Sequence, residues 1–209
     1  FQTIYKDTLN QNEILELINK VLKLYNKDEY NALDPVWSQS DIFLITYGDT
    51  LKQDNQKHLH TLSKFLDKYT KPYFNNLHIL PFFPFSSDDG FSITDYEKIR
   101  PDLGSWEDMK SLSNNFRLMS DVVINHASIK SKYFEEFMKN KGNFKDFFIK
   151  LADQDGYNDV IRPRSSDLFK EIVIDDKLWN LWCTFSHDQI DFNFKNPNVL
   201  FFFIKLIHF

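Results

Sequence analysis

Polar and aromatic residues that could bind a sugar are concentrated in the stretch Ser86–Ser92. Within it, the neighbouring carboxylates Asp88 and Asp89 are followed by Gly90 and Phe91. Carboxylates accept hydrogen bonds from sugar hydroxyls, and the ring of Phe91 could stack on a pyranose face. A surface turn or a helix cap has a similar composition, so the residues alone leave both interpretations open.

Asn125 and His126 form a second group, directly after an apolar segment that begins at Asp121. Side chains that direct hydrogen bonds suit a ligand site, although a single histidine at a strand end more often has a structural role. A carboxylate at the start of an apolar strand needs a partner if it is buried. We therefore assign Asp121 a structural role.

The tripeptide Arg162-Pro163-Arg164 contains two of the four arginines of the chain, and its proline stiffens the loop. Arginine binds carboxylate or phosphate through two parallel hydrogen bonds, which favours an anion contact here over a solvated turn. Farther along, Phe185 and Gln189 lie in a stretch that mixes an aromatic ring with amides and carboxylates. A single phenylalanine at such a position is more typical of a core.

Three short apolar runs predict β-strands, and segments with helical spacing predict the helices between them. Buried strands are expected at residues 42–47, 77–81 and 118–124, and helices at residues 59–69 and 105–115. The second helix begins with a capping box at Ser105–Asp108. This alternation predicts an α/β fold with right-handed βαβ units and a parallel sheet, whose ligand site lies at the carboxyl ends of the strands.

The pattern changes after the third predicted strand. Residues from about 127 to 190 are interpreted as an insertion, and a helix from about Asn196 returns the chain to the βα pattern. The chain begins at Phe1 without a methionine and ends at Phe209 inside an apolar helical segment without a cap. We therefore expect it to be a fragment of a longer protein.

With 25 Lys+Arg against 30 Asp+Glu, the formal net charge is −5, which argues against nucleic-acid binding. The one cysteine, Cys183, cannot form an internal disulfide, and no Cys/His spacing suits a structural zinc. The sequence has neither a signal peptide nor an apolar run of about 18 residues. We therefore expect no membrane span and a cytoplasmic location.

The stretch 121–126 (Asp-Val-Val-Ile-Asn-His) resembles the first signature region of the α-amylase superfamily, glycoside hydrolase family 13. Other stretches resemble the sucrose phosphorylase and glucosylglycerate phosphorylase branch: residues 44–49, 78–84, 86–96 and 162–164, with 182–193. The Ser-Ser-Asp-Asp-Gly-Phe-Ser form of the second-strand loop is more similar to glucosylglycerate phosphorylases than to sucrose phosphorylases.

This resemblance implies an incomplete (β/α)8 TIM barrel that contains about the first three βα units. Residues 1–126 would form the N-terminal part of the catalytic barrel, and residues 127–190 an inserted small B domain. Residues 191–209 would return to the barrel as its third helix, which is truncated.

The resemblance also implies roles for single residues. Asp88 would fix sugar hydroxyls in the −1 subsite, with Phe91 as the stacking aromatic and His126 holding the glucose 6-hydroxyl. Because the amylase calcium site is not a feature of this branch, Asn125 would be structural and no metal is expected.

Three further residues match the family at the edge of the sugar site. Phe185 and Gln189 would line the junction of the −1 and +1 subsites, and Arg164 would bind phosphate or the acceptor. The implied activity is that of a retaining α-glucoside phosphorylase, which transfers glucosyl from small-molecule glucosides to phosphate without a cofactor.

The chain also departs from the family pattern. Glycoside chemistry needs two carboxyl groups that flank the bond, and the adjacent Asp88 and Asp89 cannot do so. The family's Arg-Leu-Asp nucleophile motif does not occur. This motif, the family's acid/base glutamate and its later His-Asp pair would all lie beyond Phe209. We therefore expect residues 1–209 to be inactive alone.

Two alternatives remain open, a hydrolase or transglucosidase on the same scaffold and a non-catalytic relative. The acceptor (glycerate, fructose, glycerol or a phosphorylated sugar) and the oligomeric state are not predicted.

Overall fold

The structure is a computed structural model that describes residues 2–24, 38–157, 159–162 and 164–208. Phe1, Pro163 and Phe209, which enter the expectations above, lie outside the described residues. The chain divides into two compact units. We call residues 33–123 the parallel unit and residues 1–32 with 124–209 the antiparallel unit.

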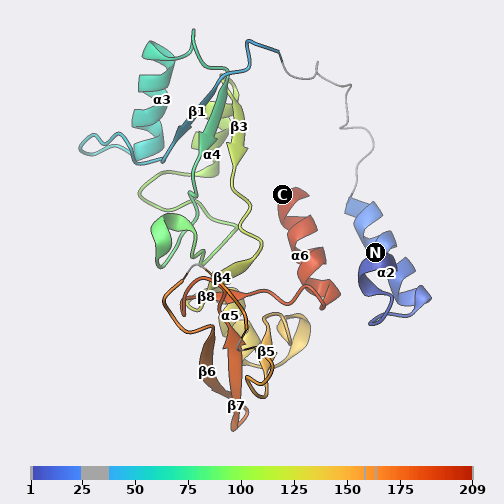
Figure 1. The fold of residues 1–209 in the computed structure, drawn as a ribbon. Coiled ribbons are helices and arrows are strands. Elements are labelled where there is room, and N and C mark those ends of the chain that lie inside the picture. Colours follow the sequence, from blue (N-terminus) through green and yellow to red (C-terminus); the bar gives the residue numbers. More distant parts are fainter. Residues whose placement is uncertain (1, 25–37, 158, 163, 209) are drawn as a thin grey trace. The chain divides into compact units, whose positions relative to one another are not determined.

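The parallel unit is built on a sheet with the order β1-β2-β3 (Figure 1). Its strands are β1 (Phe43–Thr46), β2 (Asn76–Ile79) and β3 (Arg117–Ser120), and both neighbouring pairs are parallel. Helix α3 (His58–Tyr69) connects β1 to β2, and α4 (Trp106–Ser113) connects β2 to β3. The predicted βαβ order and parallel sheet are confirmed in these residues.

Both helices form where the sequence pattern predicts them. Leu59, Leu62 and Leu66 recur at helical spacing and are buried on one side of α3. At the start of α4, the backbone N–H of Ser105 donates to the carboxylate of Asp108 at 2.8 Å, which is half of the predicted capping box.

The two faces of this sheet differ in burial. Leu77 and Ile79 on β2 are fully buried on one face of the sheet. Ile45, His78 and Met119 are aligned in register and belong to the opposite face. Ile45 is 60% exposed and Met119 49% exposed, because nothing among the described residues of this unit covers that face. The expectation that the first and third strands are buried is therefore wrong for the structure as described.

The third strand is also shorter than the sequence predicts, since it ends at Ser120 and not at Ile124. In the observed register Ile79 pairs with Ser120, so the next donor on β2 would come from Pro81, which has no N–H. The carboxylate of Asp121 lies 2.9 Å from Nε2 of His78. This contact supplies the partner that the sequence required for Asp121.

The antiparallel unit contains two small sheets, whose strands are β4 (His126–Ser128), β5 (Lys150–Leu151), β6 (Phe169–Ile174), β7 (Lys177–Trp182) and β8 (Gln189–Asp191). β4 pairs with β8, and the other sheet has the order β5-β7-β6. The β6–β7 hairpin turns at Asp175 and Asp176, which have φ of 51° and 59°. Two central residues with positive φ are typical of the type I′ turn that suits the twist of paired strands.

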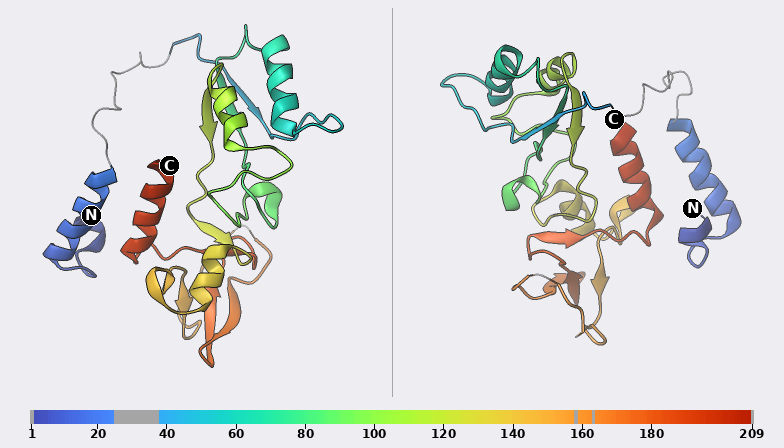
Figure 2. Two further views of the ribbon diagram at one scale, coloured as in Figure 1. Left: turned by 180° about the vertical axis from the view of Figure 1, so that it is seen from behind. Right: turned by 45° about the horizontal axis from the view of Figure 1, so that its top comes forward.

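The helices of this unit are α1 (Gln2–Tyr5), α2 (Gln11–Leu24), α5 (Lys132–Met138) and α6 (Pro197–His208), with a short 3₁₀ turn at Gly142–Phe144. Helix α6 confirms the helix predicted from about Asn196, and α2 lies along it (Figure 2). Aromatic rings form the core between α5, α6 and the strands. The ring of Phe192 stacks on Phe148 at 4.8 Å and meets the edge of Phe203 from α6 at 5.0 Å.

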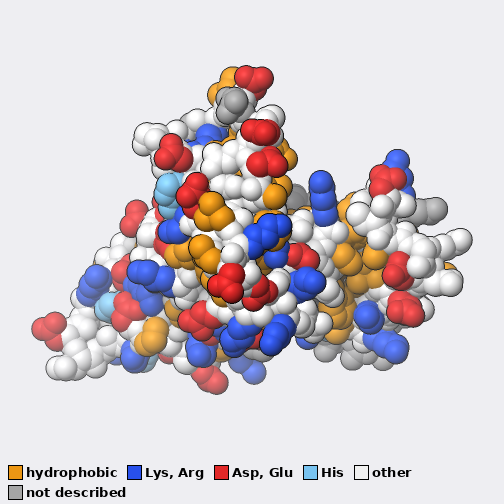
Figure 3. All heavy atoms as spheres, turned by 90° about the horizontal axis from the view of Figure 1, so that it is seen from below, with side chains coloured by type: hydrophobic (Ala, Val, Ile, Leu, Met, Phe, Trp, Pro, Cys, Tyr) orange, Lys and Arg blue, Asp and Glu red, His pale blue; other side chains and the backbone are white. Residues whose placement is uncertain are grey.

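Acidic and basic side chains are interspersed with hydrophobic ones over the face drawn in Figure 3. Among the described residues, no helix has the length and apolar character needed to cross a membrane.

Candidate functional site

The loop after β2 is a narrow hairpin-like turn. Its two sides are joined by a bridge between Phe85 and Ile93 and by a hydrogen bond from Thr94 N–H to the Pro84 carbonyl at 2.8 Å. This pairing begins at Pro84, a few residues beyond the carboxyl end of β2, and leaves residues 87–91 at the tip. The tip includes the predicted sugar-binding residues of this loop.

Three consecutive tip residues have a left-handed backbone. The φ angles of Asp88, Asp89 and Gly90 are 58°, 49° and 106°, and Phe91 N–H donates to the Asp88 carbonyl at 2.9 Å. Asp88 and Asp89 are exposed, and Phe91 is half-buried. Left-handed residues other than glycine cost free energy and occur often at functional sites, which agrees with a binding role for this tip.

Replacing Gly90 by alanine is expected to destabilise the loop strongly. A Cβ on residue 90 would lie 2.9 Å from both the Cβ and the carbonyl oxygen of Pro81, at a φ of +106°. The overlap and the strained backbone together should reduce the free energy of unfolding by about 2–4 kcal/mol. Urea unfolding of the full-length variant measures this change.

Gly156→Ala is the matched control, because Gly156 has a φ of +82° but a Cβ there would meet no atom within 4 Å. We expect this variant to lose only about 1 kcal/mol, from backbone strain alone. Equal losses in the two variants would contradict a close approach of Gly90 to Pro81.

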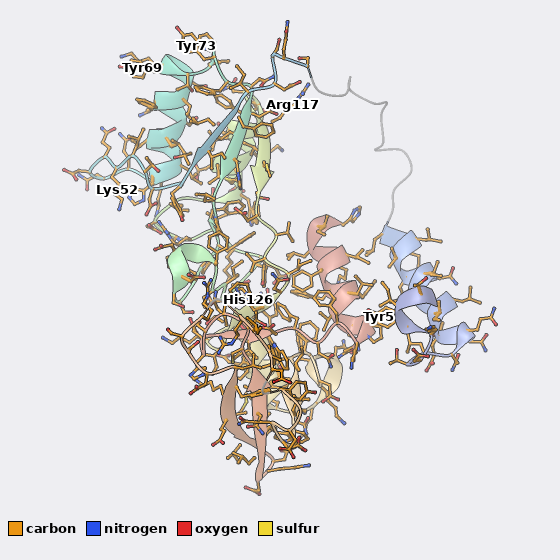
Figure 4. The ribbon with its side chains drawn as sticks, viewed as in Figure 1. Tyr5, Lys52, Tyr69, Tyr73, Arg117 and His126 are labelled. Carbon is orange, nitrogen blue, oxygen red and sulfur yellow. The ribbon has the colours of Figure 1, made fainter. Side chains whose placement is uncertain are left out.

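The pairing of β4 with β8 brings together residues that are far apart in the sequence. His126 is opposite Asp191 and Ser128 is opposite Gln189, so these four side chains share one face. His126 lies where β4 begins (Figure 4). Its Nε2 is 3.0 Å from Nε2 of Gln189, and the two residues are only 4% and 2% exposed.

The hydrogen bonds of Gln189 orient its amide. Ser186 Oγ donates to Gln189 Oε1 at 2.8 Å, and the amide nitrogen then faces His126. In this arrangement the amide donates to His126 Nε2, and a neutral imidazole carries its proton on Nδ1. The histidine is therefore held in one orientation by a buried contact.

Phe185 connects this histidine to an arginine. Its ring centroid lies 4.9 Å from that of His126, at an interplanar angle of 57°, and the guanidinium carbon of Arg164 lies 5.2 Å from the same ring. Arg164 is exposed. We call the contact series Gln189–His126–Phe185–Arg164 the imidazole–arginine cluster. It combines neutral hydrogen-bonding groups with an accessible cation, which suits a ligand that carries both hydroxyls and a negative charge.

Asp191 and Thr184 stabilise the segment next to this cluster, and neither residue was singled out from the sequence. The carboxylate of Asp191 accepts hydrogen bonds from Thr184 N–H at 3.0 Å and from Thr184 Oγ1 at 2.5 Å. Trp182 Nε1 donates to the same hydroxyl at 2.9 Å. Burial raises the pKa of Asp191, although the hydrogen bonds from Thr184 oppose this effect. No local motif signals this contact, because it joins residues on either side of a turn.

Cys183, next to Thr184, is fully buried. Burial, with the nearby carboxylate of Asp191, raises the pKa of its thiol to about 12. Such a thiol behaves as a packed apolar group and not as a nucleophile.

Asp49, His58 and Asp102 are close enough together to suggest a metal site. Arg100, however, donates to both carboxylate oxygens of Asp102 at 2.7 and 2.9 Å and to Asp49 at 2.7 Å. The guanidinium thus occupies the oxygens that a cation would need, and we interpret this group as an ion-pair network.

The structure brings four of the six predicted site residues into contact, namely Gln189, His126, Phe185 and Arg164. Asp88 and Phe91 belong to the parallel unit. That Asp88 and Phe91 converge on one pocket with His126, Phe185 and Gln189 stays a prediction.

A comparison with known families identifies the class of protein. Residues 41–209 match the family described as "Alpha amylase, catalytic domain". The chain therefore belongs to the α-amylase family, glycoside hydrolase family 13.

Individual relatives with known activities narrow this class further. The chain is 42% identical over 182 residues to glucosylglycerate phosphorylase of Spirochaeta thermophila and 38% identical over 172 residues to that of Escherichia coli. These matches cover 87% and 82% of this chain, but only 31% of each relative. A crystal structure of sucrose 6F-phosphate phosphorylase from Thermoanaerobacter thermosaccharolyticum aligns with a TM-score of 0.70 at 30% identity, covering 82% of this chain and 37% of that one.

Proposed function

We propose that the full-length protein is a retaining α-glucoside phosphorylase that transfers glucosyl from glucosylglycerate, or a similar small glucoside, to phosphate. The similarity to two glucosylglycerate phosphorylases supports the substrate class. The single observation that carries the proposal is the imidazole–arginine cluster, in which the Arg164 guanidinium lies over Phe185 beside His126.

Within this proposal, the parallel unit supplies the first strands of a (β/α)8 barrel. The β1-β2-β3 order, with a helix in each connection, supports this assignment. Residues 127–190 form the inserted B domain, which the antiparallel strands β5, β6 and β7 support. A cytoplasmic location is part of the proposal, since phosphorolysis consumes inorganic phosphate.

The proposed roles follow the chemistry of each side chain. Asp88 accepts hydrogen bonds from sugar hydroxyls, and Phe91 stacks on the ring. His126 holds the 6-hydroxyl, in an orientation set by its contact with Gln189.

Phe185 and Arg164 occupy the side of the sugar that faces the second substrate. Phosphate and the glycerate leaving group are both anions, so one exposed guanidinium can serve each of them in turn.

The reaction requires two displacements at the anomeric carbon. A carboxylate attacks this carbon while an acid protonates the leaving oxygen, which breaks the glycosidic bond and forms a β-glucosyl ester. A phosphate oxygen then attacks the same carbon, the phosphate returns a proton to the group that acted as the acid, and the carboxylate is released, which yields α-glucose 1-phosphate. We propose that the nucleophile and the acid/base come from sequence beyond Phe209, since the Arg-Leu-Asp motif does not occur in residues 1–209.

The test is to incubate the full-length protein with glucosylglycerate, with and without phosphate, and to measure both glucose 1-phosphate and free glucose. We expect glucose 1-phosphate, formed only when phosphate is present. Free glucose at the same rate in both reactions would indicate a hydrolase. A rearranged or transferred glucoside would indicate a transglucosidase, and no product from glucosylglycerate or sucrose would indicate a non-catalytic relative.

A further inference from the structure

We propose that Arg162 is a positioning residue that holds Arg164 over Phe185 and does not itself bind the anion. This inference rests on the proposed function, in which Arg164 contacts phosphate. It divides the two arginines of the tripeptide 162–164, which look alike in the sequence, into two different roles.

The contacts of Arg162 are all internal to the antiparallel unit. Its Nη1 donates to the Thr184 carbonyl at 3.1 Å and contacts Ser166 Oγ at 3.5 Å, and its Nη2 donates to the Ser166 carbonyl. The side chain is half-buried. The guanidinium of Arg162 therefore connects the loop 162–166 to the segment that carries Phe185.

Two further hydrogen bonds strengthen this connection. Ser166 Oγ donates to the Phe185 carbonyl at 3.4 Å. The backbone N–H of Arg164 donates to the Arg162 carbonyl at 2.9 Å. The backbone of Arg164 is thus tied to Arg162, whose own side chain is anchored beside Phe185.

Thr184, to which Arg162 is anchored, is also held by Asp191. The N–H and the hydroxyl of Thr184 donate to Asp191, and its carbonyl accepts from Arg162. With its N–H, hydroxyl and carbonyl all engaged, Thr184 is a rigid point of attachment. Phe185 directly follows Thr184. The position of Arg164 over the Phe185 ring then depends on the hydrogen bonds by which Arg162 bridges Thr184 and Ser166.

The sugar-binding part of the cluster does not depend on this bridge. His126 and Gln189 are placed by the β4–β8 pairing and by Ser186. A substitution of Arg162 should therefore change phosphate binding and leave binding of the glucosyl group nearly unchanged.

The test is Arg162→Lys in the full-length enzyme. A lysine has one ammonium group and cannot bridge two carbonyls as the planar fork does. We expect the KM for phosphate to rise about tenfold through misplacement of Arg164, while kcat and the KM for the glucosyl donor change by less than about twofold. Arg162→Gln should behave in the same way, and it provides a second measurement if the lysine variant is unstable.

Arg117→Lys is the matched control, since Arg117 is an exposed arginine that contacts Asp41 at 3.2 Å in the parallel unit. It should leave the KM for phosphate unchanged. Melting temperatures of all variants would show whether a kinetic change reflects unfolding.

A double-mutant cycle with Arg164→Ala separates the two proposals. If Arg162 acts only through Arg164, then Arg162→Lys should add nothing in the Arg164→Ala background. Additive effects on the KM for phosphate, or no effect of Arg162→Lys while Arg164→Ala has one, would overturn the positioning role. No effect of Arg164→Ala would instead overturn the assignment of Arg164 in the proposed function.

Discussion

Residues 1–209 produced alone are expected to show no glucosyl transfer and to aggregate without a cooperative unfolding transition. The sheet of the parallel unit has open edges at β1 and β3 in the described residues and an exposed row that includes Ile45 and Met119. Unpaired edges and exposed apolar faces favour association between chains. Turnover should be absent because, under the proposed function, the nucleophile and the acid/base are not part of this segment.

Light scattering, thermal unfolding and a glucose 1-phosphate assay on the purified segment measure these properties. The double variant Ile45→Thr/Met119→Thr is the informative comparison, because threonine suits a strand but removes much of the exposed apolar surface. We expect it to be more soluble and still inactive. A soluble monomer that unfolds cooperatively without these changes would contradict the folding prediction, and turnover would contradict the assignment of the catalytic groups.

Arg164→Ala in the full-length enzyme is expected to raise the KM for phosphate by about 10- to 150-fold, the equivalent of roughly 1.5–3 kcal/mol for a hydrogen bond to a charged group. The glucosyl side should change little, since His126 and Gln189 contact each other independently of Arg164. Steady-state kinetics with phosphate varied, and glycerate varied in the reverse direction, measure both effects.

Arg164→Lys should fall between the wild type and the alanine variant, because it keeps the charge but loses the bidentate geometry. If the KM for phosphate is unchanged in Arg164→Ala and the rate is intact, Arg164 belongs to a solvated turn.

The elements that the sequence predicted well are those specified by neighbouring residues. The leucines of α3 and the pairing of Ser105 with Asp108 lie within a few positions of each other. Local spacing is enough to predict such elements. The parallel order of the sheet then follows from the handedness of βαβ connections.

The errors concern properties that depend on distant residues. The burial of Ile45 depends on what covers the sheet and not on how apolar its own segment is. The length of β3 depends on Pro81, some forty positions earlier, which has no N–H to offer as a pairing partner.

The candidate site shows the same division. The family resemblance suggested binding roles for His126, Gln189 and Arg164, but the contact between His126 and Gln189 depends on strand pairing across about sixty residues. The hydrogen bonds that Arg162 and Asp191 make with Thr184 were not predictable. Neighbouring residues do not indicate whether a guanidinium or a carboxylate faces a ligand or a backbone group.

Chemical labelling of Cys183 can measure local unfolding of the segment around it. At pH 8, a thiol whose pKa is raised to about 12 is almost entirely protonated, and this thiol is also fully buried. Alkylating reagents should therefore modify it only during transient exposure of the segment next to Thr184. The rate of labelling, followed by mass spectrometry, then measures how often the segment around Cys183 and Thr184 unfolds locally. Because residues 1–209 contain no second cysteine, a labelled peptide from this region reports on Cys183 alone.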